Sequence, residues 1–217
     1  MTVSVNRTSE FFHSYAHDFN AIYGNSNTFV NRWINRYLRA SMRMRYEKTI
    51  AGCSPIEGKS VLDIGCGPGH YSVALAKNGA TRVYGIDFAD EMIAIASQNA
   101  ASAGVNGRCQ FARHDFLADP VDGKYDYTIA MGFMDYMADP RKTIEKVLSV
   151  TKGKAFFSFP AEGGILAWQR KLRYKQRCPL YLYTRSQLDQ LFSGVRPDQV
   201  RCEPIARDYF VTVTMLI

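Results

Sequence analysis

The stretch that decides the fold is Val61-Leu62-Asp63-Ile64-Gly65-Cys66-Gly67-Pro68-Gly69-His70. A short buried strand leads directly into a glycine-rich turn, and a helix follows. At Gly65 and Gly67 the missing side chains allow the backbone to pass close to a ligand. The helix that follows directs its free N–H groups and the positive end of its dipole into the same space. This combination predicts a nucleotide site at the carboxyl end of a strand.

The spacing of these glycines separates two classes of ligand. A dinucleotide site that serves hydride transfer prefers G-x-G-x-x-G. Here the third glycine, Gly69, comes one residue early, and His70 takes the next place. The spacing G-x-G-x-G, with Asp63 two residues before the first glycine, fits a smaller ligand without a pyrophosphate. A nicotinamide-dependent oxidoreductase is therefore the disfavoured enzyme alternative.

From Ser60 onward, strands alternate with helices, which predicts a parallel sheet covered by helices on both faces. Strands are expected over 60–64, 81–86, 108–112, 125–130, 154–159 and 208–217, and helices over 70–78, 90–103, 140–150 and 184–192. Gly153 is expected to separate a helix from the strand after it, and Thr184 to cap a helix. Residues 28–50 predict a long amphipathic helix, and a shorter aromatic-rich helical stretch precedes it.

Length and composition exclude several classes of protein. The chain has 217 residues, of which 47% are hydrophobic and 22% charged, as expected for a folded globular protein and not for a disordered or fibrous one. No apolar run is long enough to span a membrane, and the polar N-terminus does not predict a secretory signal. Five cysteines without a CxxC pair predict reduced thiols in the cytoplasm and no metal site. We expect an N-terminal helical lid over 1–55 and a ligand-binding domain over 56–217.

The positive charge is concentrated in two segments. Residues 28–50 sum to +5 and residues 165–185 to +6, against +7 for the whole chain, so the remainder is acidic. The second segment belongs to a basic, aromatic insertion over 160–183 that includes Trp168. An insertion of this composition suits a small anionic substrate and also suits RNA, which we rank second because no RNA-binding module is appended. A solvated basic surface is the structural alternative.

Two further signals follow the next strands. Asp87 ends the second expected strand, where its carboxylate can accept hydrogen bonds from the two hydroxyls of a ribose. Asp115 and Phe116 follow the third strand, where a carboxylate and a backbone N–H can bind an adenine. Taken alone, Asp87 could cap a helix and Asp115 could close a turn. Their order after successive strands predicts one site for an adenosine-containing molecule.

These segments resemble the class I S-adenosylmethionine-dependent methyltransferases. VLDIGCGPGHYS is similar to the first motif of that family, YGIDFADEM to the second, ARHDF to the third, and YDYTIAMGFMDYMAD to the region around the fourth strand. The resemblance covers about residues 60 to 160 and, more loosely, the tail. It implies a Rossmann-like, doubly wound sheet of seven strands with the last strand antiparallel, and S-adenosyl-L-methionine as the cofactor.

The resemblance also assigns roles to residues. It implies that the glycine turn and Asp63 surround the methionine part of the cofactor, that Asp87 binds the ribose, and that Asp115 with Phe116 holds the adenine. The expected cofactor contacts on the body of the domain are Asp63, Gly65, Cys66, Gly67, Asp87, Phe88, Met92, Asp115, Phe116 and Met131. Phe88 and Met92 would pack on the adenine, and Met131 with Gly132 would line the methyl-donor side.

The N-terminal part is loosely similar to the start of magnesium-protoporphyrin O-methyltransferases, through FNAIYGNSNTFVN and RMRYEKTI. That similarity implies helices that close over the cofactor. Tyr23 and an arginine, Arg39 or Arg45, are then expected to contact the cofactor, and an arginine can pair with the methionine carboxylate. Tyr15 and Phe19 are expected on the substrate side. Ordinary helix packing is the alternative for these aromatic residues.

Methyl transfer from a sulfonium is an in-line displacement, so the protein mainly aligns donor and acceptor. No side chain identifies itself as a general base, which is needed only for an acceptor that must lose a proton. Asp135 and Tyr136 follow the fourth strand, where substrate is expected. No Asn/Asp-Pro-Pro-aromatic motif follows that strand and no cysteine ends the fifth, which argues against methylation of base amines, protein glutamine or cytosine C5. The sequence predicts a small-molecule methyltransferase; a non-catalytic binding subunit is the other alternative, and the oligomeric state stays open.

Overall fold

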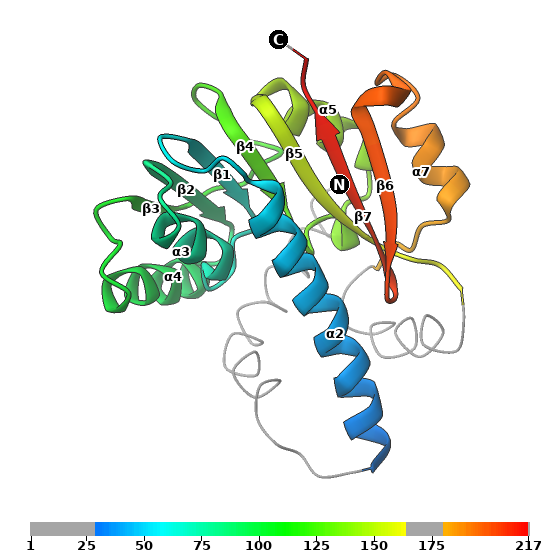
Figure 1. The fold of residues 1–217 in the computed structure, drawn as a ribbon, viewed down its shortest axis with the longest axis horizontal. Helices are drawn as coiled ribbons and strands as arrows, with labels where there is room; N and C mark the ends of the chain where they lie inside the picture. Colours follow the sequence, from blue (N-terminus) through cyan, green and yellow to red (C-terminus); the bar gives the residue numbers. More distant parts are fainter. Residues whose placement is uncertain (1–28, 164–179, 217) are drawn as a thin grey trace.

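Seven strands form one mixed sheet in the order β3-β2-β1-β4-β5-β7-β6 (Figure 1). The computed structural model describes residues 29–163 and 180–216. The strands are β1 Ser60–Ile64, β2 Arg82–Asp87, β3 Cys109–Arg113, β4 Tyr125–Ala130, β5 Thr151–Pro160, β6 Val200–Ile205 and β7 Asp208–Thr214. The first five strands are parallel, whereas β7 runs antiparallel to both β5 and β6. The predicted α/β sheet with an antiparallel last strand is confirmed.

Helices cover both faces of this sheet. They are α2 Phe29–Gly52, α3 His70–Lys77, α4 Asp90–Ser102, α5 Pro140–Ser149 and α7 Arg185–Leu191, with short 3-10 turns over Met134–Tyr136 and Pro197–Gln199. The end of α2 packs with α3 and α4 on one face, and α5 packs with α7 on the other (Figure 1). Strands β1 and β4 and the part of β5 after Lys154 are largely buried between these layers, as expected for parallel strands covered on both faces.

The long helix α2 lies close to the sheet at its C-terminal end. A Cβ atom on Gly52 would lie 2.6 Å from Cε1 of Phe156 on β5, so the helix can approach this strand only because residue 52 has no side chain. The helix predicted over 28–50 is confirmed. Its role as part of a lid over 1–55, separate from 56–217, stays a prediction. No helix among the described residues has the length and apolar character that a membrane crossing requires.

Local capping explains where two helices begin. The carboxylate of Asp139 accepts a hydrogen bond from the backbone N of Lys142, and proline occupies the first helical position of α5. At the start of α7, the hydroxyl of Thr184 accepts from the backbone N of Gln187, whose side chain accepts in return from the backbone N of Thr184. The N-cap predicted at Thr184 is therefore confirmed.

The expected break at Gly153 is wrong. Strand β5 begins at Thr151 and includes this glycine, and its register against β4 shifts between Tyr125 and Tyr127. A Cβ at Gly153 would lie 2.6 Å from the carbonyl oxygen of Asp126. The glycine thus permits a close approach of two strands at an irregularity, which a local sequence pattern does not distinguish from a turn.

Candidate active site

Three strand ends meet at Asp87. The carboxylate of this residue, at the end of β2, accepts a hydrogen bond from the backbone N of Gly67 at 2.9 Å and from the backbone N of Ala89 at 3.0 Å. Its backbone carbonyl accepts from the N of His114, just after β3, at 2.8 Å. One residue therefore joins the glycine turn, the start of α4 and the end of β3. The convergence of these strand ends, expected from the sequence, is present.

Two of the three glycines in the turn after β1 have different surroundings. Gly65 has φ +66°, and a Cβ there would lie 2.8 Å from Cδ2 of Phe133. Gly67 has φ +51°, and a Cβ there would meet nothing within 4 Å. The turn is fixed by hydrogen bonds from the backbone N of Cys66 to the carbonyl of Ile86, and from Nδ2 of Asn99 to the carbonyl of Pro68. Gly67 thus presents backbone to open space on a rigid support, as a site for a closely held ligand requires.

Asp63 lies beneath this turn. Its side chain is 2% exposed, and its Oδ2 accepts a hydrogen bond from Oγ of Ser72 on α3 at 2.6 Å. Burial raises the pKa of Asp63 to about 6, although the hydrogen bonds from Ser72 act in the opposite direction. The carboxylate ties the helix to the strand, and its expected contact with the cofactor stays a prediction.

Cys66 packs inward from the turn. It is buried, and burial raises the pKa of its thiol, as do the nearby carboxylates of Asp63 and Asp87. A thiol in this environment is not a nucleophile at neutral pH. The part that Cys66 can contribute to a ligand site is therefore its backbone.

Asp115 and Phe116 follow β3. One carboxylate oxygen of Asp115 accepts hydrogen bonds from the backbone N atoms of Leu117 and Ala118, so the residue does close a turn. Phe116 is buried and meets the ring of Phe133 edge-on, with ring centroids 6.1 Å apart. The turn fixes this segment just after β3, whose end is joined to the end of β2, and its contact with an adenine stays a prediction.

Phe88 and Met92 lie together at the start of α4. Met92 is buried against Ala89, and the half-buried Phe88 packs on the same cluster. Phe88 directly follows Asp87 and Met92 lies in the first turn of α4, so together they form an apolar patch close in the chain to the carboxylate expected to bind the ribose.

A second polar cluster lies at the ends of β4, β5 and β7. Oγ of Ser158 accepts hydrogen bonds from the backbone N of Gly132 at 2.7 Å and from Nη1 of Arg45 at 3.2 Å. Nε of Arg45 lies 3.7 Å from Oδ2 of Asp208, and this carboxylate also accepts from the hydroxyl of Ser41. Met131, half-buried, directly precedes Gly132. Arg45 is thus bound at the sheet edge next to the loop after β4.

The residues expected to contact substrate are only partly described. Asp135 is buried and Tyr136 half-buried in the short turn after β4. The carboxylate of Asp135 contributes, after burial, to the raised pKa of Tyr183. Tyr15, Phe19, Tyr23 and Trp168 lie outside the described residues, as does most of the basic insertion. No group of acidic, histidine and cysteine side chains suited to a metal ion occurs in the described ranges.

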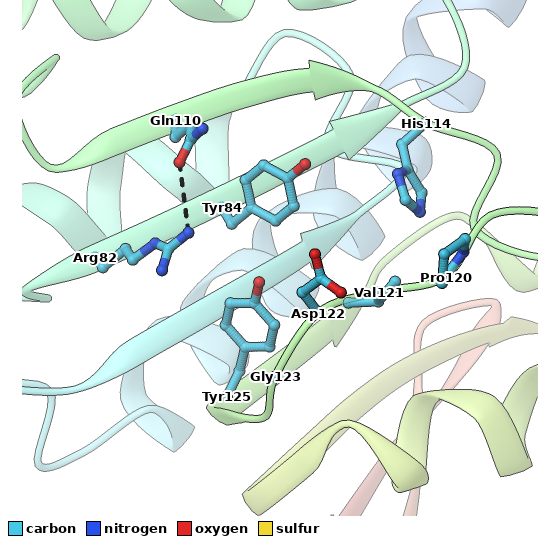
Figure 2. Close-up of a pocket in the computed structure, with 9 residues that line it drawn as sticks. All are labelled: Arg82, Tyr84, Gln110, His114, Pro120, Val121, Asp122, Gly123 and Tyr125. Atoms are coloured by element: carbon cyan, nitrogen blue, oxygen red, sulfur yellow. Dashed lines mark hydrogen bonds between the residues drawn. The ribbon is translucent and has the colours of Figure 1, made fainter.

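A hollow of about 550 Å³ lies elsewhere, on the sheet face opposite α3 (Figure 2). Figure 2 shows the rings of Tyr84 and Tyr125 side by side on this face, with His114 at one end of the hollow. The ring centroids of the two tyrosines are 6.5 Å apart. Because its lining comes from the sheet face and the loop before β4, this hollow does not include the glycine turn.

Sequence reasoning missed the partners that hold the candidate site residues. Ser72 binds Asp63, Ser158 and Asp208 contact Arg45, and Ser41 in turn binds Asp208. One signal was available in the sequence. Asp208 stands at the start of the apolar, alternating strand β7, and a carboxylate is unusual at a buried position. The partners of Arg45 lie more than a hundred residues away in the chain, so no local pattern predicts the pairing.

Comparison with known families gives a match over more than half of the chain. A family model described as "Methyltransferase domain" matches residues 56–179. A ubiquinone biosynthesis O-methyltransferase of Pseudomonas fluorescens is 33% identical over 105 residues, which are 48% of this chain and 45% of that protein. One of Coxiella burnetii is 34% identical over 105 residues, covering 48% of this chain and 44% of that protein. The match therefore spans less than half the length of these curated relatives.

Solved structures show the same fold over nearly the whole chain. Magnesium protoporphyrin IX methyltransferase from Synechocystis with bound SAH has a TM-score of 0.76 at 20% identity, covering 96% of this chain and 98% of that one. The same protein with bound SAM gives a TM-score of 0.72. At this level of identity the likeness supports the fold and not the substrate.

Proposed function

Because this chain belongs to the methyltransferase domain family, we propose that it is an S-adenosylmethionine-dependent enzyme that methylates a small molecule. The observation that carries the proposal is the junction at Asp87, where the glycine turn, the start of α4 and the end of β3 are held together. The names of the relatives add oxygen as the acceptor atom.

The residues present fit this cofactor. Gly67 offers open space in which a Cβ would meet nothing, so the methionine part can pass close to the backbone. The Asp87 carboxylate oxygens each accept one backbone hydrogen bond and retain a lone pair for a ribose hydroxyl. The segment of Asp115 and Phe116 then receives the adenine, and Phe88 with Met92 packs on its faces.

Bound S-adenosylmethionine supplies a methyl group that its sulfonium charge has already activated. The protein has to hold donor and acceptor in line and exclude water, and such positioning can supply about 7–11 kcal/mol of a barrier. The loop of Met131 and Gly132 lies on the donor side, with Gly132 fixed by its hydrogen bond to Ser158. An acceptor that is already deprotonated needs no general base.

The acceptor that we propose is anionic. The basic segments 28–50 and 165–185 carry the excess charge of the chain, and the first of them reaches the sheet edge through Arg45. Positive charge around a site raises the local concentration of anions and the rate at which they bind. The proposed enzyme therefore acts on a small carboxylate- or phosphate-bearing metabolite.

Calorimetric titration tests the cofactor assignment. We expect saturable binding of S-adenosylhomocysteine and no binding of NAD; the opposite pattern would show a nicotinamide site instead. Transfer of labelled methyl from the donor into a metabolite extract then tests catalysis. Label in RNA instead of small molecules would favour an RNA methyltransferase, and binding without any labelled product would favour a non-catalytic subunit.

A further inference from the structure

We propose that Arg45 is the specificity residue for the methyl acceptor, binding its anionic group through N–H donors that have no partner in the part of the chain that the structure describes. This inference rests on the proposed function and assigns the arginine to the acceptor instead of the methionine carboxylate. Its basis is the cluster of Arg45, Asp208, Ser158 and Gly132 at the carboxyl edge of the sheet.

The position of this cluster in the sheet separates it from the cofactor groups. The glycine turn, Asp87 and Asp115 follow β1, β2 and β3, whereas the partners of Arg45 belong to β5, β7 and the loop after β4. In the sheet order these are two separate halves, and the order reverses between β1 and β4. Ligands of such sheets bind outside the carboxyl ends of the strands at this reversal. A cofactor on the first half therefore leaves the second half for the acceptor.

The guanidinium retains capacity to bind. Of its five N–H donors, only one on Nη1 has a hydrogen-bond partner among the described residues, the hydroxyl of Ser158. Nε is buried without a hydrogen bond, because Oδ2 of Asp208 lies 3.7 Å away. The arginine side chain is nevertheless 15% exposed. A carboxylate or phosphate can accept two parallel hydrogen bonds from such a fork.

The surroundings fix the arginine in place. Asp208 is 3% exposed, and its carboxylate balances the charge of Arg45 in this largely buried environment. Ser158, also buried, accepts from both Arg45 and the backbone N of Gly132. A Cβ on Gly132 would lie 3.7 Å from Nη1 of Arg45. The anion-binding group is thus held beside the loop that we place on the methyl-donor side.

The same helix supplies a matched control. Three residues further along α2, Lys48 pairs with Glu203 on β6 at 3.2 Å, and these side chains are 35% and 28% exposed. This pair also ties α2 to the sheet, but it lies at the outer strand, away from Gly132. If the ion pairs on α2 only anchor the helix, replacing Arg45 and replacing Lys48 should both affect protein stability alone. If Arg45 binds the acceptor, its replacement should also weaken acceptor binding, whereas replacement of Lys48 should not.

The test uses the full-length protein loaded with S-adenosylhomocysteine. The probes are 3,4-dihydroxybenzoate and catechol, which share two hydroxyl groups and differ in one carboxylate. Calorimetry compares the wild type with Arg45→Gln, Arg45→Lys and Lys48→Gln. Arg45→Lys keeps a cation beside Asp208, so it remains informative if Arg45→Gln fails to fold.

We expect the wild type to bind the benzoate more tightly than catechol. Arg45→Gln should weaken benzoate binding by roughly 10- to 100-fold, as expected for lost hydrogen bonds between charged groups, and leave catechol binding unchanged. Arg45→Lys should lose part of this preference because it lacks the planar fork, and Lys48→Gln should keep all of it.

Two results would overturn the assignment. The first is a wild type that shows no preference for the carboxylate, including one that binds neither probe. The second is an Arg45→Lys variant that binds S-adenosylhomocysteine more weakly by the same factor, which would return the arginine to the cofactor. Failure of the wild type to bind S-adenosylhomocysteine at all would instead refute the proposed function.

Discussion

Replacement of Asp87 by alanine tests the central junction of the site. The change removes the acceptor of two backbone hydrogen bonds, from Gly67 at 2.9 Å and from Ala89 at 3.0 Å. It also removes the carboxylate that we expect to bind the ribose hydroxyls. We therefore expect effects on both stability and cofactor affinity, and the structure allows each to be bounded.

Hydrogen bonds to a charged group contribute about 1.5–3 kcal/mol each, so the two backbone bonds have a gross value of about 3–6 kcal/mol. Burial raises the pKa of Asp87, which means that the ionised carboxylate also incurs a desolvation cost that the alanine removes. We expect a net loss of about 1–3 kcal/mol in the free energy of unfolding.

The loss of ribose hydrogen bonds should weaken S-adenosylhomocysteine binding by about 1–3 kcal/mol, or roughly 5- to 150-fold. Asp87→Asn retains one acceptor oxygen, so it can keep one of the two backbone bonds and should fall between alanine and the wild type. The control is Asp90→Asn, which neutralises an exposed carboxylate in the first turn of α4 that pairs with Arg113 at 3.4 Å. An exposed pair of this kind contributes little, so this variant should bind as the wild type does.

Calorimetric titration gives the affinity, and urea unfolding gives the stability of each variant. The reasoning is refuted if Asp87→Ala unfolds cooperatively and binds S-adenosylhomocysteine within twofold of the wild type. A loss of affinity of equal size in Asp90→Asn would also contradict it, because the effect would then come from general charge and not from the junction.

Three further changes test other parts of the site. Gly67→Ala should lower stability by only about 1–2 kcal/mol, for a left-handed residue with open surroundings, but should greatly weaken cofactor binding; unchanged affinity would place the cofactor elsewhere. Because burial raises the pKa of Asp63 from 3.8 to about 6, wild-type unfolding free energy should increase as pH falls through 6 towards 4, by at most about 3 kcal/mol. Asp63→Asn should lack the part of this increase that Asp63 contributes and keep any part that comes from Asp87, whose pKa burial also raises; an identical pH profile in urea unfolding across that range would contradict the assignment. Charge reversal at Arg170 and Lys171 should impair turnover without changing cofactor affinity, whereas unchanged turnover would make the insertion a solvated surface.

The sequence predicted the helices, strands and turns that are determined by residues within the same segment. The strand ending at Ile64, the glycine turn and the long amphipathic helix combine a clear hydrophobic period with clear breaks, and the structure has them nearly where they were expected. The resemblance implied seven strands, but the sequence pattern did not locate β6, because it is an edge strand with Pro204 and charged residues in place of an apolar run. Its existence depends on pairing with β7, which is a contact between segments and not a property of either one.

The same distinction applies to the candidate site. The positions of Asp87 and Asp115 follow from strand ends, so the topology alone brings them together. The environment of Asp63 and Arg45 depends instead on Ser72 and Asp208, residues of common types with no characteristic spacing. Which hydrogen bonds and ion pairs Asp63 and Arg45 form depends on their burial, and that burial depends on which helices cover each strand end.

The loop after β4 connects the two halves of the sheet edge. Gly132 binds Ser158 on the acceptor half through its backbone N, while the ring of the next residue, Phe133, lies against Gly65 and meets Phe116 edge-on. A cofactor that orders the glycine turn therefore also limits the positions of Phe133, and through the chain those of Gly132 and its hydrogen-bond partner. Because coupling between binding sites is reciprocal, an acceptor held at Arg45 should favour the same loop position that the cofactor does. We therefore expect Gly132 and Phe133 to help align donor and acceptor for the in-line displacement, without either of them taking part in the chemistry.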